Sequence, residues 1–131
     1  MTSRPKVAVV NGLQDTMDLL EVALQDAGYH TIAVEARDVR MGIVDLPALA
    51  RTHGLSAILY DVAIPYAANW EFLTALRRQH GNELPPFVLT TTNQRALASF
   101  AGEETSAIEI IGKPYDIEAV VNAMHRAVRS R

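Results

Sequence analysis

The chain has 131 residues, of which 49% are hydrophobic and 21% charged, and its formal net charge is −3. This length suits one domain and is short for two, so we expect a single domain over 1–131 with its core at about 6–128. The absence of cysteine excludes disulfides, thiolate catalysis and cysteine-ligated metals. The negative net charge argues against nucleic-acid binding, which would need clustered Lys and Arg.

Two features of the sequence predict a cytoplasmic protein that does not enter a membrane. No apolar run approaches the roughly 20 residues that a membrane-spanning helix needs. Residues 1–6 are polar and lack the apolar stretch of a signal peptide.

In the first half of the chain, short apolar runs alternate with segments of helical periodicity. The continuous apolar character of 6–10 is typical of a strand buried on both faces. Apolar residues at helical spacing predict a helix over 15–27, which Gly28 is suited to end. After a second strand at 30–34, Asp45 is predicted to cap a helix whose first turn tolerates Pro47.

The second half continues the alternation. Three further strands are predicted at 56–60, 86–90 and 107–111. Three further helices are predicted at 68–79, 94–102 and 117–129, the last ending in basic residues that suit a helix C-terminus. Five βα units in succession predict an α/β fold, with a parallel sheet and helices on both of its faces.

Polar residues follow four of the predicted strands, where ligands bind in sheets of this kind. Asn11 and Gly12 follow the first strand, and Asp61 follows the third. Thr90 ends the fourth strand, and Lys113 lies shortly after the fifth. A carboxylate, a hydroxyl and an ammonium group are therefore expected to converge on one edge of the sheet.

This set of groups suits phosphoryl transfer to a carboxylate. Asp61 can act as the nucleophile and form an acyl phosphate. Lys113 supplies a positive charge opposite the phosphoryl group, and Thr90 supplies a hydroxyl donor to a phosphoryl oxygen.

Three short motifs, and their order along the chain, resemble those of the receiver domains of response regulators, the CheY-like family. Residues 60–65 (YDVAIP) are similar to the strand-three phosphorylation motif, in which Asp precedes Pro by four positions. Residues 89–91 (LTT) are similar to the strand-four Thr/Ser motif, and 112–115 (GKPY) to the strand-five Lys-Pro-aromatic motif. The resemblance covers about 6–128.

The resemblance implies a flavodoxin-like (βα)5 three-layer sandwich with strand order 2-1-3-4-5. It implies a bacterial two-component phosphorelay protein in which Asp61 accepts a phosphoryl group from a histidine kinase or phosphotransfer protein, assisted by Mg²⁺. Thr90 would then follow the phosphoryl group and change the surface that a downstream protein partner reads. Such a module is not an enzyme beyond self-phosphotransfer and autodephosphorylation.

The same resemblance implies two structural details. The peptide bond between Lys113 and Pro114 is expected to be cis. A homodimer is expected through the surface of 94–102, 107–111 and 117–129, where arginines are suited to polar contacts. These arginines are Arg126, Arg129 and Arg131.

The sequence departs from the family pattern after the first strand. Asn11 and Gly12 stand where receivers carry two acidic residues, and Mg²⁺ usually takes one or two carboxylates among its oxygen ligands. The candidate ligands left are Asp61, Asn11 and the backbone carbonyl of Ala63. Asp15 is interpreted as a helix-start residue rather than a ligand. We therefore predict weak Mg²⁺ binding and slow or absent phosphorylation.

Smaller departures favour an alternative function. Ile110 stands where many receivers carry Tyr or Phe, Thr91 stands where they carry a small residue, and the turn before the third helix reads Ala68-Asn69. The alternative is a degenerate pseudo-receiver that acts as a phosphorylation-independent binding or dimerisation module.

Other kinds of site are disfavoured. The four histidines share no metal-ligand spacing, and Trp70 and Phe72 are interpreted as packing or interface residues. A small-molecule enzyme or flavin carrier would need a glycine-rich phosphate loop, which the sequence lacks.

Overall fold

The computed structural model of the chain describes residues 4–93, 95, 108–113 and 116–130. The strands are β1 (Lys6–Asn11), β2 (His30–Glu35), β3 (Leu55–Val62), β4 (Phe87–Thr91) and β5 (Ile108–Gly112). The described helices are α1 (Gln14–Asp26), α2 (Ala36–Arg40), α3 (Leu46–His53), α4 (Tyr66–His80) and α6 (Ile117–Arg129), with a 3-10 turn, η1 (Gly81–Glu83).

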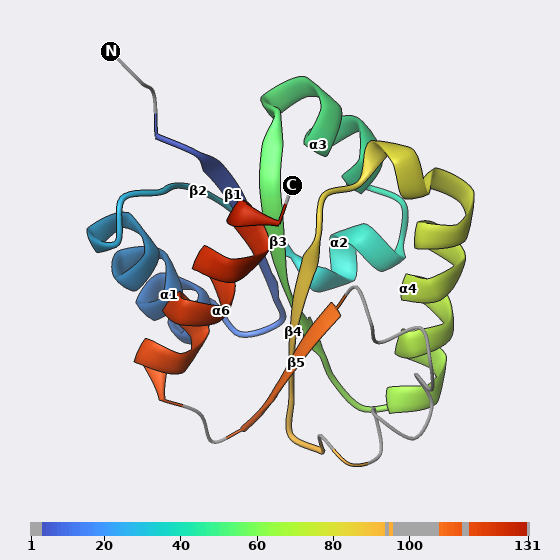
Figure 1. Ribbon diagram of the computed structural model, residues 1–131. Helices are drawn as coiled ribbons and strands as arrows, with labels where there is room; N and C mark the ends of the chain where they lie inside the picture. Colours follow the sequence, from blue (N-terminus) through green and yellow to red (C-terminus); the bar gives the residue numbers. More distant parts are fainter. Residues whose placement is uncertain (1–3, 94, 96–107, 114–115, 131) are drawn as a thin grey trace.

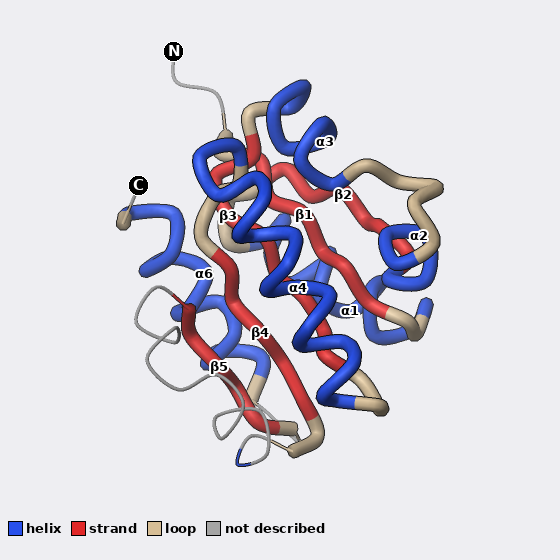
Figure 2. Tube along the Cα trace, turned by 90° about the vertical axis from the view of Figure 1, so that its right-hand side faces the viewer, coloured by secondary structure: helices blue, strands red, loops and turns tan. Residues whose placement is uncertain are grey.

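The five strands form one parallel sheet in the order β2-β1-β3-β4-β5, as predicted (Figure 1). Helices α1 and α6 cover one face of the sheet, and α2, α3 and α4 cover the other (Figure 2). The three-layer α/β architecture is therefore confirmed. Each predicted strand occurs with its ends displaced by at most two residues.

The alternation of side chains along the strands divides the core into two clusters, one on each face. In β1, Val7 and Val9 join the cluster under α1 and α6, whereas Ala8 and Val10 join the cluster under α2, α3 and α4. All four residues are buried, as the continuous apolar run predicts. Trp70 and Phe72 pack into the second of these clusters, which confirms their predicted packing role.

The region between β2 and β3 holds two short helices. The side chain of Asp45 caps α3 by accepting a hydrogen bond from the backbone N–H of Ala48, as predicted. Helix α2 was not predicted, because five residues are too few for helical periodicity to show. It contributes Ala36 and Val39 to the core.

Several sequence predictions lie outside the described residues. These are most of the helix at 94–102, the Lys113–Pro114 peptide bond and the Arg131 contact of the expected dimer. Within the described chain, the Ile64–Pro65 peptide bond is cis. None of the described helices is long and apolar enough to cross a membrane.

Candidate functional site

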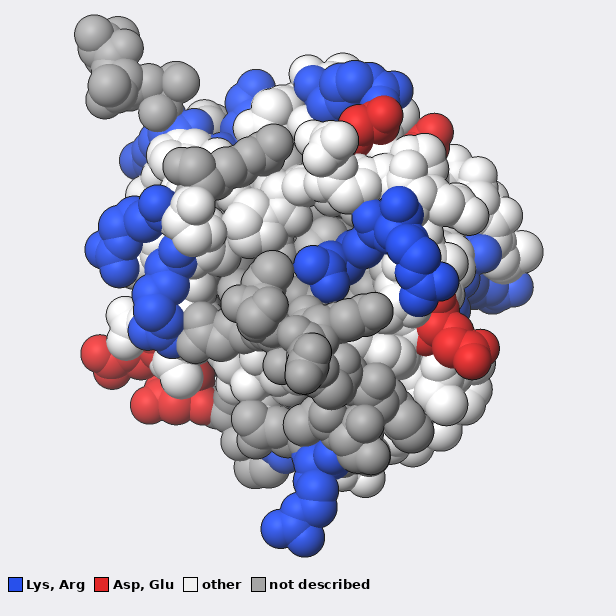
Figure 3. All heavy atoms as spheres, turned by 45° about the vertical axis from the view of Figure 1, so that its right-hand side comes forward, with Lys and Arg blue, Asp and Glu red and all other residues white. Residues whose placement is uncertain are grey.

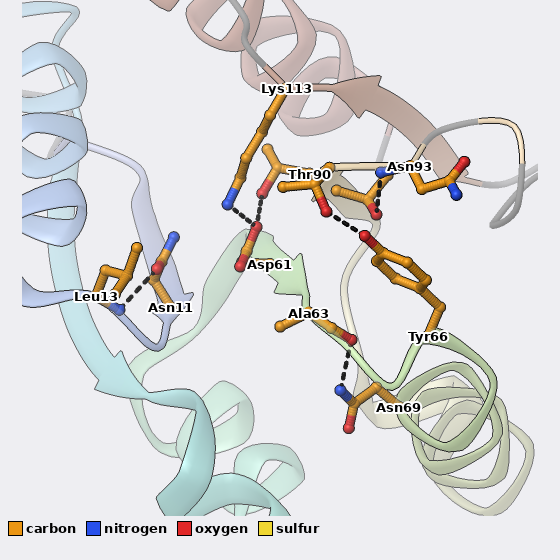
Figure 4. A network of polar contacts seen from close by, with 11 residues as sticks. Asn11, Leu13, Asp61, Ala63, Tyr66, Asn69, Thr90, Asn93 and Lys113 are labelled. Carbon is orange, nitrogen blue, oxygen red and sulfur yellow. Dashed lines mark hydrogen bonds and ion pairs between the residues drawn. The ribbon is translucent and has the colours of Figure 1, made fainter.

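The carboxyl ends of β1, β3, β4 and β5 bring the predicted residues together at one edge of the sheet (Figure 4). Asp61 and Thr90 are paired across β3 and β4 in the sheet register. Asp61 lies inside β3 rather than after it, because β3 continues to Val62. Its backbone is therefore held by the sheet, which fixes the position of the carboxylate.

Asp61, Thr90 and Lys113 form the centre of the site (Figure 4). The Thr90 hydroxyl donates a hydrogen bond to Asp61 Oδ1 at 2.7 Å, and Lys113 Nζ lies 2.7 Å from the same oxygen. The second carboxylate oxygen of Asp61 points away from both (Figure 4). The Asp61 side chain is 8% exposed and that of Lys113 19%, so the ion pair is largely screened from water. Such a pair is held by charge-assisted hydrogen bonds and is sensitive to the loss of either partner.

The end of β4 positions Lys113 and the start of the following loop. The backbone N–H of Lys113 donates to the Thr91 carbonyl oxygen at 2.7 Å, which extends the pairing of β4 with β5 by one residue. The buried Thr91 hydroxyl accepts a hydrogen bond from the backbone N–H of Asn93 at 3.2 Å. Thr91 thus shapes the loop with its hydroxyl, which a smaller apolar residue would not do.

The two neutral oxygens predicted as metal ligands both accept hydrogen bonds from other groups of the chain. Asn11 is buried, and its Oδ1 accepts a hydrogen bond from the backbone N–H of Leu13 at 2.9 Å. The carbonyl oxygen of Ala63 accepts a hydrogen bond from Asn69 Nδ2 at 2.7 Å. The sequence did not predict this contact, although Asn69 stands at a position where the sequence departs from the family pattern.

As arranged, these groups do not fit Mg²⁺. The cation prefers oxygen ligands with carboxylates among them, and Asp61 Oδ1 is already bound to Lys113 and Thr90. In the part of the chain that the structure describes, no group of three or more His, Asp or Glu side chains could hold a metal ion. Asp15 lies exposed in the first turn of α1, as expected for a helix-start residue.

Two further features surround the site. The hydroxyls of Tyr66, at the start of α4, and Thr92, just after β4, are hydrogen-bonded to each other. This bond joins the segments that follow β3 and β4 (Figure 4). Leu13 and Ile64, in the segments after β1 and β3, are largely exposed apolar side chains. The sequence carried no signal for the contact between Tyr66 and Thr92, which joins two separate segments.

On the face of the molecule drawn in Figure 3, the charged side chains of the described residues are not concentrated in one place. On this face, Lys and Arg lie in several separate groups, with Asp and Glu near some of them. Among the ion pairs, Arg51 Nη1 lies 2.6 Å from Glu83 Oε2, and both side chains are exposed.

The fold has many counterparts among solved structures. The chemotaxis response regulator CheY4 of Vibrio cholerae is 25% identical, with a TM-score of 0.71, and the match covers 95% of this chain and 99% of that one. The chain has the fold of a response-regulator receiver domain. The receiver domain of the Francisella response regulator 1452 is 18% identical, with coverage of 96% and 98% and a TM-score of 0.73. A signal receiver domain from Bacteroides fragilis is 16% identical, with coverage of 96% and 98% and a TM-score of 0.72.

No protein-family model matches the chain, and no curated protein matches its sequence. The likeness to receiver domains therefore rests on the fold and on the motifs at the carboxyl edge of the sheet.

Proposed function

We propose that the protein is a receiver module of a bacterial two-component phosphorelay and that Asp61 accepts the phosphoryl group. The observation that carries the proposal is the contact set of Asp61, where an ammonium group and a hydroxyl meet one oxygen of a buried carboxylate. The receiver fold places this set at the edge of the sheet where ligands bind.

The proposed reaction needs a phosphohistidine on a kinase or phosphotransfer protein as the donor. A carboxylate oxygen of Asp61 attacks the phosphorus, an O–P bond forms and the N–P bond of the phosphohistidine breaks. The electron pair of that bond remains on the imidazole nitrogen. Lys113 opposes the negative charge of the transferred group, and the Thr90 hydroxyl donates a hydrogen bond to it.

The remaining parts of the proposal follow from the same assignment. A downstream protein partner would bind the surface of β5 and α6, and the same surface would form the homodimer. The protein would act in the cytoplasm and would not catalyse a reaction on other molecules. Weak Mg²⁺ binding is proposed because Asn11 Oδ1, the Ala63 carbonyl oxygen and Asp61 Oδ1 already have hydrogen-bond or ion-pair partners.

The test is phosphorylation of the purified protein by a phosphorylated phosphotransfer protein or by phosphoramidate, followed by intact mass spectrometry. We expect a slow gain of the mass of one phosphoryl group, because Mg²⁺ assistance is weak, and no gain in an Asp61→Asn variant. Asp45→Asn is a suitable control, since it changes an acidic side chain that caps α3 and lies outside the site. A gain that persists in Asp61→Asn would contradict the assignment of Asp61.

A second candidate function is a phosphorylation-independent binding module. It is favoured by the Thr90 contact, since the hydroxyl already reaches Asp61 in the unmodified chain. In this case Asp61 and Lys113 form a structural ion pair. No added mass with any donor, together with partner binding that Asp61→Asn leaves unchanged, would favour the second function over the first.

A further inference from the structure

The Asn69 side chain forms a hydrogen bond with a carbonyl oxygen of the site. It lies in the first turns of α4, is 7% exposed, and donates from Nδ2 to the Ala63 carbonyl oxygen at 2.7 Å. Its backbone N–H donates to the Pro65 carbonyl oxygen, so the start of the helix does not depend on the side-chain amide. The amide therefore acts on Ala63 independently of the bond that begins α4.

We infer that the Asn69 carboxamide occupies the Ala63 carbonyl oxygen in place of a divalent cation and thereby keeps the metal affinity of this site low. Asn69 is a positioning residue in this inference, because it acts through the carbonyl of Ala63. The inference deepens the proposed function and rests on it for the role of the site, but metal binding is measured without any phosphoryl donor.

The hydrogen bond opposes metal binding for a physical reason. A cation that took the Ala63 oxygen would displace a buried N–H donor from its partner, and an unpaired buried donor weakens binding by roughly 5- to 100-fold. An N–H group and a metal ion both carry positive charge toward the oxygen. They therefore compete for the electron density of the same carbonyl oxygen.

The charge of the neighbouring groups also opposes metal binding. The negative charge of Asp61 is matched by Lys113, and Asn11 Oδ1 is held by the backbone N–H of Leu13. The contact set of Asp61 thus lacks the excess negative charge that attracts a dication. Asn69 engages the Ala63 carbonyl oxygen, so a cation bound through the second carboxylate oxygen of Asp61 gains no support from this carbonyl.

A purely structural role for Asn69 makes a different prediction. If the amide only held the segment between β3 and α4, its removal would lower stability and leave metal affinity unchanged. The decisive quantity is therefore the dissociation constant for a metal ion, with unfolding measured beside it.

Two variants separate these roles. Asn69→Ala frees the Ala63 oxygen, and Asn69→Asp replaces the donor by a carboxylate of the same shape. The matched control is Thr74→Val, because Thr74 is buried to a similar degree on α4 and donates to the Glu71 carbonyl oxygen within the helix. Thr74 lies about 7 Å farther along the helix axis, away from the edge of the sheet.

The measurement is a titration with Mn²⁺ alone. Electron paramagnetic resonance reports the concentration of free Mn²⁺, and quenching of Trp70 fluorescence reports the bound ion. Trp70 is the single tryptophan and adjoins Asn69 in the chain. We expect Asn69→Ala to bind Mn²⁺ at least fivefold more tightly than the parent chain. Asn69→Asp should bind at least tenfold more tightly and gain thermal stability on addition of Mn²⁺. Thr74→Val should match the parent chain.

Dissociation constants for both Asn69 variants within twofold of the parent value would overturn the inference, even if both variants unfold more easily. A gain of the same size in Thr74→Val would overturn it as well, because loosening of α4 would then be the cause. If Asn69→Ala does not fold, the isosteric Asn69→Asp decides the outcome. Failure of phosphorylation at Asp61 contradicts the proposed function alone, since no phosphoryl donor enters these titrations.

Discussion

The ion pair between Lys113 and Asp61 should respond unequally to the removal of its two partners. Lys113→Met leaves the carboxylate of Asp61, 8% exposed, without its counter-charge. Breaking a fully buried pair in this way costs about 3–5 kcal/mol, and the 19% exposure of Lys113 reduces the expected loss to about 2–3 kcal/mol. For a domain of this size, that corresponds to a decrease in Tm of roughly 10 °C.

Asp61→Asn should be less harmful. The longer Lys113 side chain can turn its ammonium group toward water, and the Asn side chain still accepts the hydrogen bond from Thr90, so we expect a loss of about 1 kcal/mol. The double variant Asp61→Asn/Lys113→Met removes both charges and should lie within about 1 kcal/mol of the parent chain. The double-mutant cycle should therefore give a coupling energy of about 3 kcal/mol.

The assay is guanidinium unfolding followed by Trp70 fluorescence, with an unchanged m-value required for each variant. Arg51→Met is the matched control, because Arg51 and Glu83 form an equally short ion pair whose side chains are 61% and 44% exposed. Its loss should change stability by less than about 0.5 kcal/mol. If Lys113→Met costs no more than Arg51→Met, or no more than Asp61→Asn, the burial argument for the site is refuted.

Three further predictions concern residues outside the Asp61 contacts. The Tyr60 hydroxyl is buried with no hydrogen-bond partner among the described residues, so Tyr60→Phe should raise the free energy of unfolding by about 1 kcal/mol. Burial also raises the pKa of Tyr60 above 10.0, because the folded state favours the neutral phenol. The contribution of this preference to the free energy of unfolding is fully present below pH 10.0 and is lost as the pH rises through the folded-state pKa. Urea unfolding at increasing alkaline pH should therefore show a smaller loss in Tyr60→Phe, and equal losses in the two proteins would contradict this reasoning. Asp45→Ala removes the cap that accepts from Ala48 and should cost about 1 kcal/mol in thermal unfolding, whereas no change would show that the cap contributes nothing. Gly54 has a φ of 63° and no atom within 4 Å of where a Cβ would lie, so Gly54→Ala should cost about 1–2 kcal/mol from backbone strain alone, and a neutral result in chemical denaturation would refute this.

The sequence by itself was sufficient for the architecture and for the three residues at the centre of the site. Strand and helix periodicities are local properties of the chain, and they located all five strands to within two residues. Once the strands are parallel, their carboxyl ends must share one edge of the sheet, so Asp61, Thr90 and Lys113 were expected to meet there. The structure places both partners on Asp61 Oδ1.

The tertiary structure decided which groups compete for each oxygen of the site. Nothing in the sequence indicates that Asn69 reaches back to the Ala63 carbonyl, because this depends on the orientation of α4 against the segment that follows β3. The bond between Tyr66 and Thr92 depends in the same way on two segments that are separate in the chain. Residue types and spacing determine which groups approach one edge, whereas hydrogen-bond partners there depend on distances of a few tenths of an ångström that only the packed helices and loops define.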